Sequence, residues 1–318
     1  MSIYDVIKHA DSGSIKEAAA LLQGGDLVAF PTETVYGLGA DARSDMAAAK
    51  IFAAKKRPQF NPLIVHVPDM MAAEKYAVFS ADARKLAAKF WPGALTIVAA
   101  RKPGCELSLL VSAGLDTLAL RVPDNQTAQK LLAAFGGPVA APSANPSGRI
   151  SPTEAEHVAE GFSCGEVSLV LDGGSCSLGL ESTIIGCDGA DPVLLRPGGI
   201  AREEIEAVLG RKLAIRQDDE AINAPGQGSS HYAPRASLRL NAKTPVPGEM
   251  WLAFGSGGPR NIPGLNLSPA GDLTEAAANL FAYLHMLDDT GAGKIAVMPI
   301  PETGLGEAIN DRLRRAAV

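Results

Sequence analysis

The spacing of apolar residues divides the chain into short segments of two kinds. In residues 14–22 apolar side chains recur every three or four positions, which is typical of an amphipathic helix, and Gly24-Gly25 ends the pattern. Residues 26–30 form a short apolar run that Pro31 stops, which is typical of a buried strand. The same criteria predict further helices over 44–57, 81–90, 126–135, 202–209, 273–288 and 306–316, and further strands over 63–67, 95–99, 117–121, 139–141, 169–171, 182–185, 193–196, 250–254 and 294–298.

Predicted helices and strands are mixed throughout, and several strands follow one another directly, which favours an α/β fold with a mixed sheet. A stretch rich in glycine, serine and proline near 224–234 indicates a linker. We therefore predict a first domain over 1–200, a linker or lid over 201–236 and a second domain over 237–318. The order of elements in the second domain is typical of a small Rossmann-like α/β domain, but it has no G-x-G-x-x-G motif, which argues against a dinucleotide site.

Length and composition narrow the class of protein. A chain of 318 residues suits two domains, and 47% apolar with 20% charged residues excludes a disordered chain. The net charge of −6 argues against wholesale coating of nucleic acid but allows a local basic cleft. The N-terminal segment lacks the apolar core of a signal peptide and no run of about 18 apolar residues occurs, so we expect a cytoplasmic protein without a membrane span. Four cysteines without a C-x-x-C pair and five scattered histidines predict reduced thiols and no metal held by the protein.

Polar side chains gather beside glycine and proline where predicted strands begin or end. The segment Pro31-Thr-Glu-Thr-Val-Tyr-Gly-Leu-Gly39 is either a capped turn or a loop that approaches a small polar ligand. Similar segments are Ala141-Pro-Ser-Ala-Asn-Pro-Ser-Gly148, Gly179-Leu-Glu-Ser-Thr183 and Arg196-Pro-Gly-Gly199. None matches a nucleophile elbow, a phosphate-binding loop or a catalytic triad, so together they indicate a site that binds and orients reactants.

Several cationic side chains are also candidates. Lys55, Lys56 and Arg57 lie at a helix C-terminus, where they either satisfy the helix dipole or face a pocket and hold phosphate. His66, within an apolar strand, is more typical of a core histidine than of a catalyst. Arg121 ends an alternating strand, so we expect an anionic partner for it, either a protein acid or a ligand carboxylate.

Taken together, these motifs resemble a known family. Pro31–Gly39, the Lys-x-Arg-Pro-x-x-Asn-Pro-Leu run at 55–63, Ser143-Ala-Asn145, Ser182-Thr183 and Arg196-Pro-Gly198 occur in the order found in YrdC-like domains. The segment His231-Tyr-Ala-Pro234 and the second domain resemble the long, two-domain form of the threonylcarbamoyl-AMP synthase family. The resemblance covers essentially the whole chain, and it implies a twisted, mixed α/β first domain with a concave basic cavity.

The resemblance implies an enzyme, a nucleotidyltransferase that makes L-threonylcarbamoyladenylate from L-threonine, bicarbonate and ATP and releases pyrophosphate. It assigns Lys55 and Arg57 to catalysis, with Lys55 facing the phosphates, and Tyr232 to closing over the nucleotide. Its L-threonine residues correspond here to Thr34, His66, Arg121, Ala141 and Ser182, and its ATP residues to Arg57, Asn61, Thr117, Ser143, Asn145, Ser151, Arg196 and Tyr232.

Further expectations follow from the same resemblance. Magnesium would accompany ATP, and the product would pass to a transferase complex that modifies adenosine in tRNA, without stable binding of nucleic acid by this chain. A threonine carbamate would attack the α-phosphorus, and this chemistry relies on positioning and charge rather than on a protein nucleophile. Two departures stand out: the common Lys-Gly-Arg-Pro is Lys55-Lys-Arg-Pro58 here, and the linker carries Pro225-Gly-Gln-Gly-Ser-Ser230 where a lysine and an aromatic residue are usual.

Two other classes of function compete with the synthase. One is a double-stranded RNA-binding module, because related YrdC-like domains have been linked with such RNA, although the net charge and the lack of interleaved aromatic and basic residues argue against it. The other is a carbamoyl-transfer domain like those of hydrogenase maturation factors, whose additional acylphosphatase and zinc motifs do not occur in this sequence.

Overall fold

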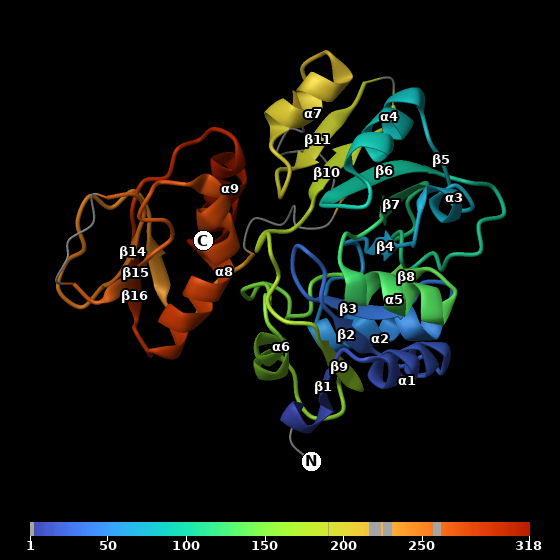
Figure 1. Cartoon of the computed structure of the whole chain (residues 1–318), viewed down its shortest axis with the longest axis horizontal. Coiled ribbons are helices and arrows are strands. Elements are labelled where there is room, and N and C mark those ends of the chain that lie inside the picture. Colours follow the sequence, from blue (N-terminus) through green and yellow to red (C-terminus); the bar gives the residue numbers. More distant parts are fainter. Residues whose placement is uncertain (1–2, 190, 216–223, 225–230, 257–261) are drawn as a thin grey trace.

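The computed structural model describes residues 3–189, 191–215, 224, 231–256 and 262–318, which form a larger and a smaller α/β unit (Figure 1). Two segments of the predicted linker, 216–223 and the unusual 225–230, lie outside the described residues. No helix in the described ranges is long and apolar enough to cross a membrane.

The larger unit is built on one mixed sheet of twelve strands with the order β1-β9-β2-β3-β8-β4-β7-β6-β10-β11-β12, in which β5 pairs with β6. Parallel pairs such as β4 with β7 and antiparallel pairs such as β6 with β7 both occur, as the mixed pattern predicts. The strands are β1 (Ile7–His9), β2 (Val28–Phe30), β3 (Gly37–Asp41), β4 (Ile64–His66), β5 (Ala77–Val78), β6 (Leu95–Arg101), β7 (Thr117–Arg121), β8 (Val139–Ala140), β9 (Leu169–Asp172), β10 (Thr183–Gly186), β11 (Val193–Arg196) and β12 (Ala214–Ile215).

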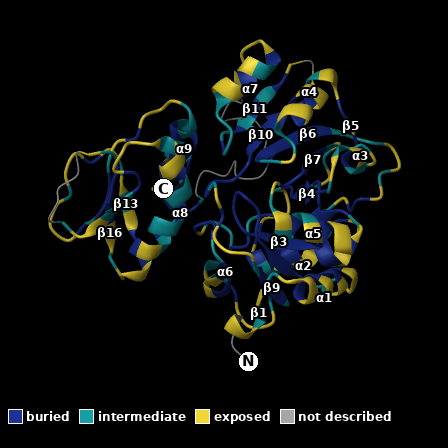
Figure 2. Cartoon of the chain, viewed as in Figure 1, coloured by how far each residue is buried: buried dark blue, intermediate teal, exposed yellow. Residues whose placement is uncertain are grey.

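Helices cover this sheet and turn their polar sides to solvent, so the strands are the most buried part of the unit (Figure 2). Five of the described helices of this unit are preceded by a residue whose side chain accepts a backbone N–H of the first turn: Asp11, Ser44, Asp69, Ser80 and Asn125. The helical elements are η1 (Ile3–Val6), α1 (Ser12–Gln23), α2 (Asp45–Lys55), α3 (Met70–Ala73), α4 (Ala81–Phe90), α5 (Gln126–Phe135), α6 (Ala155–Gly161) and α7 (Arg202–Leu209).

The smaller unit is a parallel sheet with the order β13-β16-β14-β15. Its strands are β13 (Ser237–Arg239), β14 (Met250–Ala253), β15 (Gly264–Asn266) and β16 (Lys294–Val297), and its helices are α8 (Leu273–Asp289) and α9 (Leu305–Ala316). Both helices lie between this sheet and the larger unit (Figure 1). One apolar cluster joins the units, because Val35, Ile150 and Leu180 of the larger unit pack in the same core as Leu280 and Phe281 of α8.

The junction between the units is closely packed. Gly179 has a φ of +66°, and a Cβ built on it would lie 2.4 Å from the carbonyl oxygen of Ala278 in α8, so only glycine lets the two backbones approach this closely. The rings of His157 in α6 and His285 in α8 stack with their centroids 3.9 Å apart. These contacts fix α8 against the larger unit.

The predicted helices agree with the observed ones to within two residues at either end. The differences concern short elements: β3 occupies Gly37–Asp41, part of which was predicted as loop, and α6 falls in a region with no predicted element. The sequence of β3, Gly-Leu-Gly-Ala-Asp, lacks the β-branched and aromatic residues that favour strands, so only pairing with β2 and β8 makes it one.

Candidate active site

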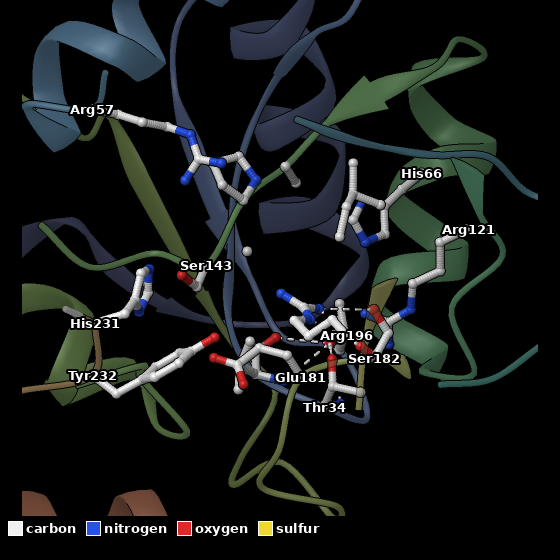
Figure 3. A pocket seen from close by; sticks show the side chains of 16 residues that line it. Thr34, Arg57, His66, Arg121, Ser143, Glu181, Ser182, Arg196, His231 and Tyr232 are labelled. Carbon is white, nitrogen blue, oxygen red and sulfur yellow. Dashed lines mark hydrogen bonds between the residues drawn. The ribbon is translucent and has the colours of Figure 1, made fainter. Parts of the chain in front are cut away.

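A cavity of about 40 Å³ lies where β3, β4, β7 and β10 of the large sheet end or begin, and residues 231–232 cover part of it (Figure 3). Its lining side chains come from segments that are far apart in the sequence, including the strand-end motifs. The predicted site residues that line it are Thr34, Arg57, His66, Arg121, Ala141, Ser143, Ser182, Arg196 and Tyr232.

Two buried guanidinium groups, those of Arg57 and Arg196, give the cavity its positive charge. Arg57 donates to neutral oxygens only: its Nη2 bonds Asn61 Oδ1 at 2.6 Å and the carbonyl of Pro62 at 2.8 Å. Arg196 donates through Nη2 to the carbonyl oxygen of Ser182 at 2.9 Å. Burial, together with the neighbouring Arg196, lowers the pKa of Arg57 to about 9, so Arg57 remains protonated at neutral pH.

Gly198 explains how the Arg196-Pro-Gly motif reaches the cavity. A Cβ on Gly198 would lie 2.4 Å from the carbonyl oxygen of Glu181 and 2.4 Å from the backbone nitrogen of Thr183. The chain after β11 therefore lies directly against the chain before β10, and this contact places Arg196 and Ser182 side by side.

Arg121 has a protein acid as its partner, which settles the alternative that the sequence left open. Its Nη2 donates to Glu33 Oε1 at 2.6 Å, and both side chains are buried. The other carboxylate oxygen, Glu33 Oε2, accepts the backbone N–H of Asp124. Since Arg121 still lines the cavity, its remaining N–H groups are placed to bind a ligand carboxylate there.

His66 lines the same part of the cavity, and its Nδ1 is buried without a hydrogen-bond partner among the described residues. Burial and the adjacent Arg121 lower the pKa of His66 to about 3, so its imidazole is neutral at physiological pH. The packed edge-to-face ring of Phe30 holds it in place. A neutral imidazole with a free Nδ1 suits a polar, uncharged part of a ligand.

Residues 231–232 close the opposite side of the cavity in the view of Figure 3. Tyr232 has a φ of 66°, which is uncommon for a residue other than glycine, and its buried hydroxyl has no partner in the described structure. The neighbouring His231 is partly buried, and its buried Nδ1 has no partner among the described residues. The segment that covers the cavity therefore carries two polar atoms, the Tyr232 hydroxyl oxygen and His231 Nδ1, that have no hydrogen-bond partner among the described residues.

Lys55 does not face the cavity, contrary to the position that the resemblance implies. Its ammonium donates to the carbonyl oxygen of Ser143 at 2.6 Å and to that of Asn145. Burial and the nearby Arg57 hold the pKa of Lys55 well below its usual range. The physical reason for the difference is that a fully buried ammonium needs acceptors, and these backbone carbonyls supply them.

Four other predicted residues lie around the cavity rather than in its lining. Asn61 supports Arg57, and Ser151 donates to Glu181 Oε1. The Asn145 side chain donates to the carbonyl oxygens of Pro146 and Arg149. Thr117 begins β7, at the opposite end from Arg121, and the register of β4 and β7 brings it beside the chain that carries Asn61.

The described residues contain no group of three or more histidine, cysteine or acidic side chains that could hold a metal ion. The one acidic side chain in the lining, Glu181, has both oxygens engaged, because Ser151 donates to one and Arg312 to the other.

Comparison with known proteins identifies the family. The model described as "Telomere recombination" matches residues 20–198, and the model described as "Threonylcarbamoyl-AMP synthase, C-terminal domain" matches residues 200–318. This chain belongs to the threonylcarbamoyl-AMP synthase family. It is 41% identical to the synthase of Bacillus subtilis (strain 168) over 95% of this chain and 92% of that protein, and 39% identical to the synthase of Pyrococcus abyssi (strain GE5 / Orsay) over 99% and 97%. Its structure is similar to that of P. abyssi Sua5 complexed with L-threonine, with a TM-score of 0.88 and 38% identity over 98% of this chain and 96% of that one.

Seven residues of this threonylcarbamoyl-AMP synthase family member line the cavity although they were not among the predicted site residues, and two of the seven, Glu181 and His231, have titratable side chains. Both lie inside motifs that the sequence singles out, at 179–183 and 231–234, but the sequence did not predict that their side chains line the cavity. Glu181 bonds Arg312, which is 131 residues away in the chain and in the other unit. No local spacing reveals a pair of that kind.

Proposed function

We propose that this chain makes L-threonylcarbamoyladenylate from L-threonine, bicarbonate and ATP, with release of pyrophosphate, and is thus a nucleotidyltransferase. The supporting observation is the buried Arg57, which lines the cavity beside Arg196 and has only neutral oxygens as partners in the described structure. A buried guanidinium without a carboxylate partner among the described residues favours a bound anion, and a polyphosphate suits the two positive charges that Arg57 and Arg196 bring to the cavity.

The threonine half of the proposed site lies at the C-terminal ends of β4 and β7. Arg121, already fixed by Glu33, would bind the threonine carboxylate through its remaining N–H groups. The neutral His66 and Ser182 would hydrogen-bond the amino-acid head group and its carbamate, while Thr34 and Ala141 complete the wall. The similarity to P. abyssi Sua5, whose structure is a complex with L-threonine, supports L-threonine as the ligand.

The ATP half would extend from Arg196 and Ser143 toward the N-terminal ends of the same two strands. There Arg57, Asn61 and Thr117 lie together, at the other end of β7 from Arg121. The parallel pairing of β4 and β7 thus supports an extended ligand, with its acyl group at one strand end and its nucleoside at the other.

The proposed reaction has two steps. The threonine amine attacks the carbon of bicarbonate, and loss of water gives the carbamate. A carbamate oxygen then attacks the α-phosphorus of ATP, and the bond between that phosphorus and the bridging oxygen to the β-phosphate breaks, so that pyrophosphate leaves. The chain would contribute orientation and positive charge from Arg57 and Arg196, and we propose no protein nucleophile. Lys55 would act in catalysis indirectly, by holding the loop that carries Ser143.

Magnesium would enter with ATP as part of the substrate, bound to the phosphates. The engaged oxygens of Glu181 fit this role, since they leave no open carboxylate to hold a resident ion.

The covering segment has a role in this scheme. A cavity of about 40 Å³ is too small for ATP, so residues 231–232 must move for the nucleotide to enter. Closure of Tyr232 over the bound substrates would exclude water, which hydrolyses carbamates.

We further propose that the chain works in the cytoplasm and passes its product to a tRNA-modifying transferase complex. An RNA-binding module is not favoured, because full-length similarity to synthases covers both units.

Pyrophosphate release by the purified protein tests the proposal directly. We expect release that requires ATP, L-threonine and bicarbonate together, with a product whose mass equals that of threonylcarbamoyl-AMP. Arg57→Met should raise the KM for ATP at least tenfold when it is assayed at a temperature at which the variant is still folded. The matched control is Arg84→Met, because Arg84 is a half-exposed arginine far from the cavity lining. Release that is independent of threonine would contradict the proposed reaction.

A further inference from the structure

Among the described residues Arg312 is the largest side chain that is fully buried, and although it belongs to α9 of the smaller unit, where it pairs with Asp311, it also reaches the larger unit. Its Nε donates to Glu181 Oε2 at 2.8 Å, and its Nη2 donates to the carbonyl oxygen of Pro197 at 3.0 Å. Its guanidinium carbon also lies 5.0 Å from the centroid of the Tyr232 ring. Arg312 therefore contacts two residues of the cavity wall, Glu181 and Tyr232, without lining the cavity itself.

The positive charge of Arg312 matters for the cavity because it lies next to the carboxylate of Glu181. This carboxylate lines the same cavity as Arg57 and Arg196, where an uncompensated negative charge would repel a polyphosphate. Burial alone would raise the pKa of Glu181, but Arg312, Arg196 and the hydroxyl of Ser151 lower it to about 2, so it is ionised at neutral pH. The carboxylate is thus an anion whose nearest counter-ion is the guanidinium of Arg312.

Tyr232 depends on the same arginine. Its left-handed backbone conformation costs about 1–2 kcal/mol, so the surrounding structure must hold the residue in place. Its ring packs between Arg312 and Phe281 of α8, whose ring centroid is 5.6 Å away. The smaller unit consequently supports both faces of the side chain that covers the cavity.

We propose that Arg312 is a positioning residue for the nucleotide half of the cavity: by neutralising Glu181 and supporting Tyr232, it makes the smaller unit an integral part of the polyphosphate site. The inference rests on the proposed function, since it takes ATP as the ligand. It assigns the smaller unit an electrostatic task in addition to any mechanical one. Arg312 acts through Glu181 and Tyr232, without touching the substrate.

A double-mutant comparison tests this inference, with binding of the non-hydrolysable analogue α,β-methylene-ATP measured by calorimetry on the full chain. Arg312→Met should weaken the analogue at least tenfold, because Glu181 then keeps an unneutralised charge in the cavity. Combining Arg312→Met with Glu181→Gln should restore most of that loss, which a merely structural role would not do. Threonine affinity should change less than threefold in both variants. Arg314→Met, on the exposed side of the same helix, is the matched control and should bind the analogue like the wild type.

The outcomes separate this inference from the proposed function. If the wild type binds the analogue but folded Arg312→Met binds it within twofold as tightly, or if Glu181→Gln restores nothing, the inference is wrong while the ATP site stands. If the wild type does not bind the analogue, the ATP site itself is refuted. Should Arg312→Met fail to fold, Glu181→Gln alone decides: it removes an anion and keeps Arg312, so it should bind the analogue at least as tightly as the wild type, and clearly weaker binding would overturn the inference.

Discussion

Replacing Lys55 with methionine distinguishes a structural lysine from one that holds phosphate. Methionine keeps the apolar stem but removes the ammonium, which leaves the carbonyl oxygens of Ser143 and Asn145 without their donor. Hydrogen bonds to a charged group contribute about 1.5–3 kcal/mol each, so the two bonds together contribute about 3–6 kcal/mol. Relief of the buried charge and of its repulsion by Arg57 offsets part of this, because both lower the pKa of Lys55 in the folded state. We expect a net loss of about 2–4 kcal/mol of unfolding free energy.

A loss of that size should lower the melting temperature by about 4–16 °C, since 1 kcal/mol corresponds to about 2–4 °C for a unit of this size. The measurement is urea unfolding together with a thermal scan. Lys56→Met is the matched control, because Lys56 is the next residue and its side chain is exposed, so its change should stay within about 0.5 kcal/mol. If Lys55→Met melts like the wild type but loses turnover, the lysine acts on substrate and the structural assignment is wrong.

Three further predictions concern single positions. Lys56 has a φ of 51° at the end of α2, so Lys56→Gly should raise the unfolding free energy by about 0.5–1 kcal/mol in urea, and a decrease would contradict the backbone argument. Gly179→Ala should lower the unfolding free energy by about 2 kcal/mol or more and increase hydrogen exchange in α8, because Gly179 has a positive φ and an added Cβ would collide with Ala278. Unchanged hydrogen exchange would show that the backbone shifts to accommodate the Cβ. Burial and the stacked His157 lower the pKa of His285 to about 3, so below pH 6.5 the unfolded chain takes up a proton that the folded chain does not, and the unfolding free energy falls as the pH decreases. His285→Phe should therefore remove about 2 kcal/mol of the stability loss between pH 7 and pH 5. A variant with the same pH profile as the wild type would refute this.

The position of Lys56 also gives a physical reason for one departure from the family pattern. Glycine is common where this chain has lysine, and the left-handed backbone there explains that preference. The lysine keeps the same backbone, so the added charge lies on an exposed side chain and not in the cavity.

The correct predictions of helices and strands rest mostly on patterns within a few residues of one another. Caps such as Ser44 and Asn125, and periodic apolar runs, specify helix limits because the contacts involved lie within a few residues. The strand-end motifs predicted which segments gather, since Thr34, Ser143, Ser182 and Arg196 from four such motifs line one cavity.

What the sequence does not predict is which way a buried polar group turns. Lys55 belongs to a basic run that suits phosphate, yet its ammonium finds backbone carbonyls some 90 residues away. Arg121 required an anion, but only the fold shows that Glu33 supplies it. These outcomes depend on long-range packing, which spacing along the chain does not encode.

The pairing of Glu181 with Arg312 has a consequence for how the protein is made. The two residues are 131 positions apart, so at about 5–20 residues per second the ribosome adds the arginine roughly 7–26 s after the glutamate. During that interval the larger unit can form its sheet while the Glu181 carboxylate lacks the guanidinium of Arg312. We therefore expect nascent chains that have not reached α9 to bind ATP more weakly than the completed chain.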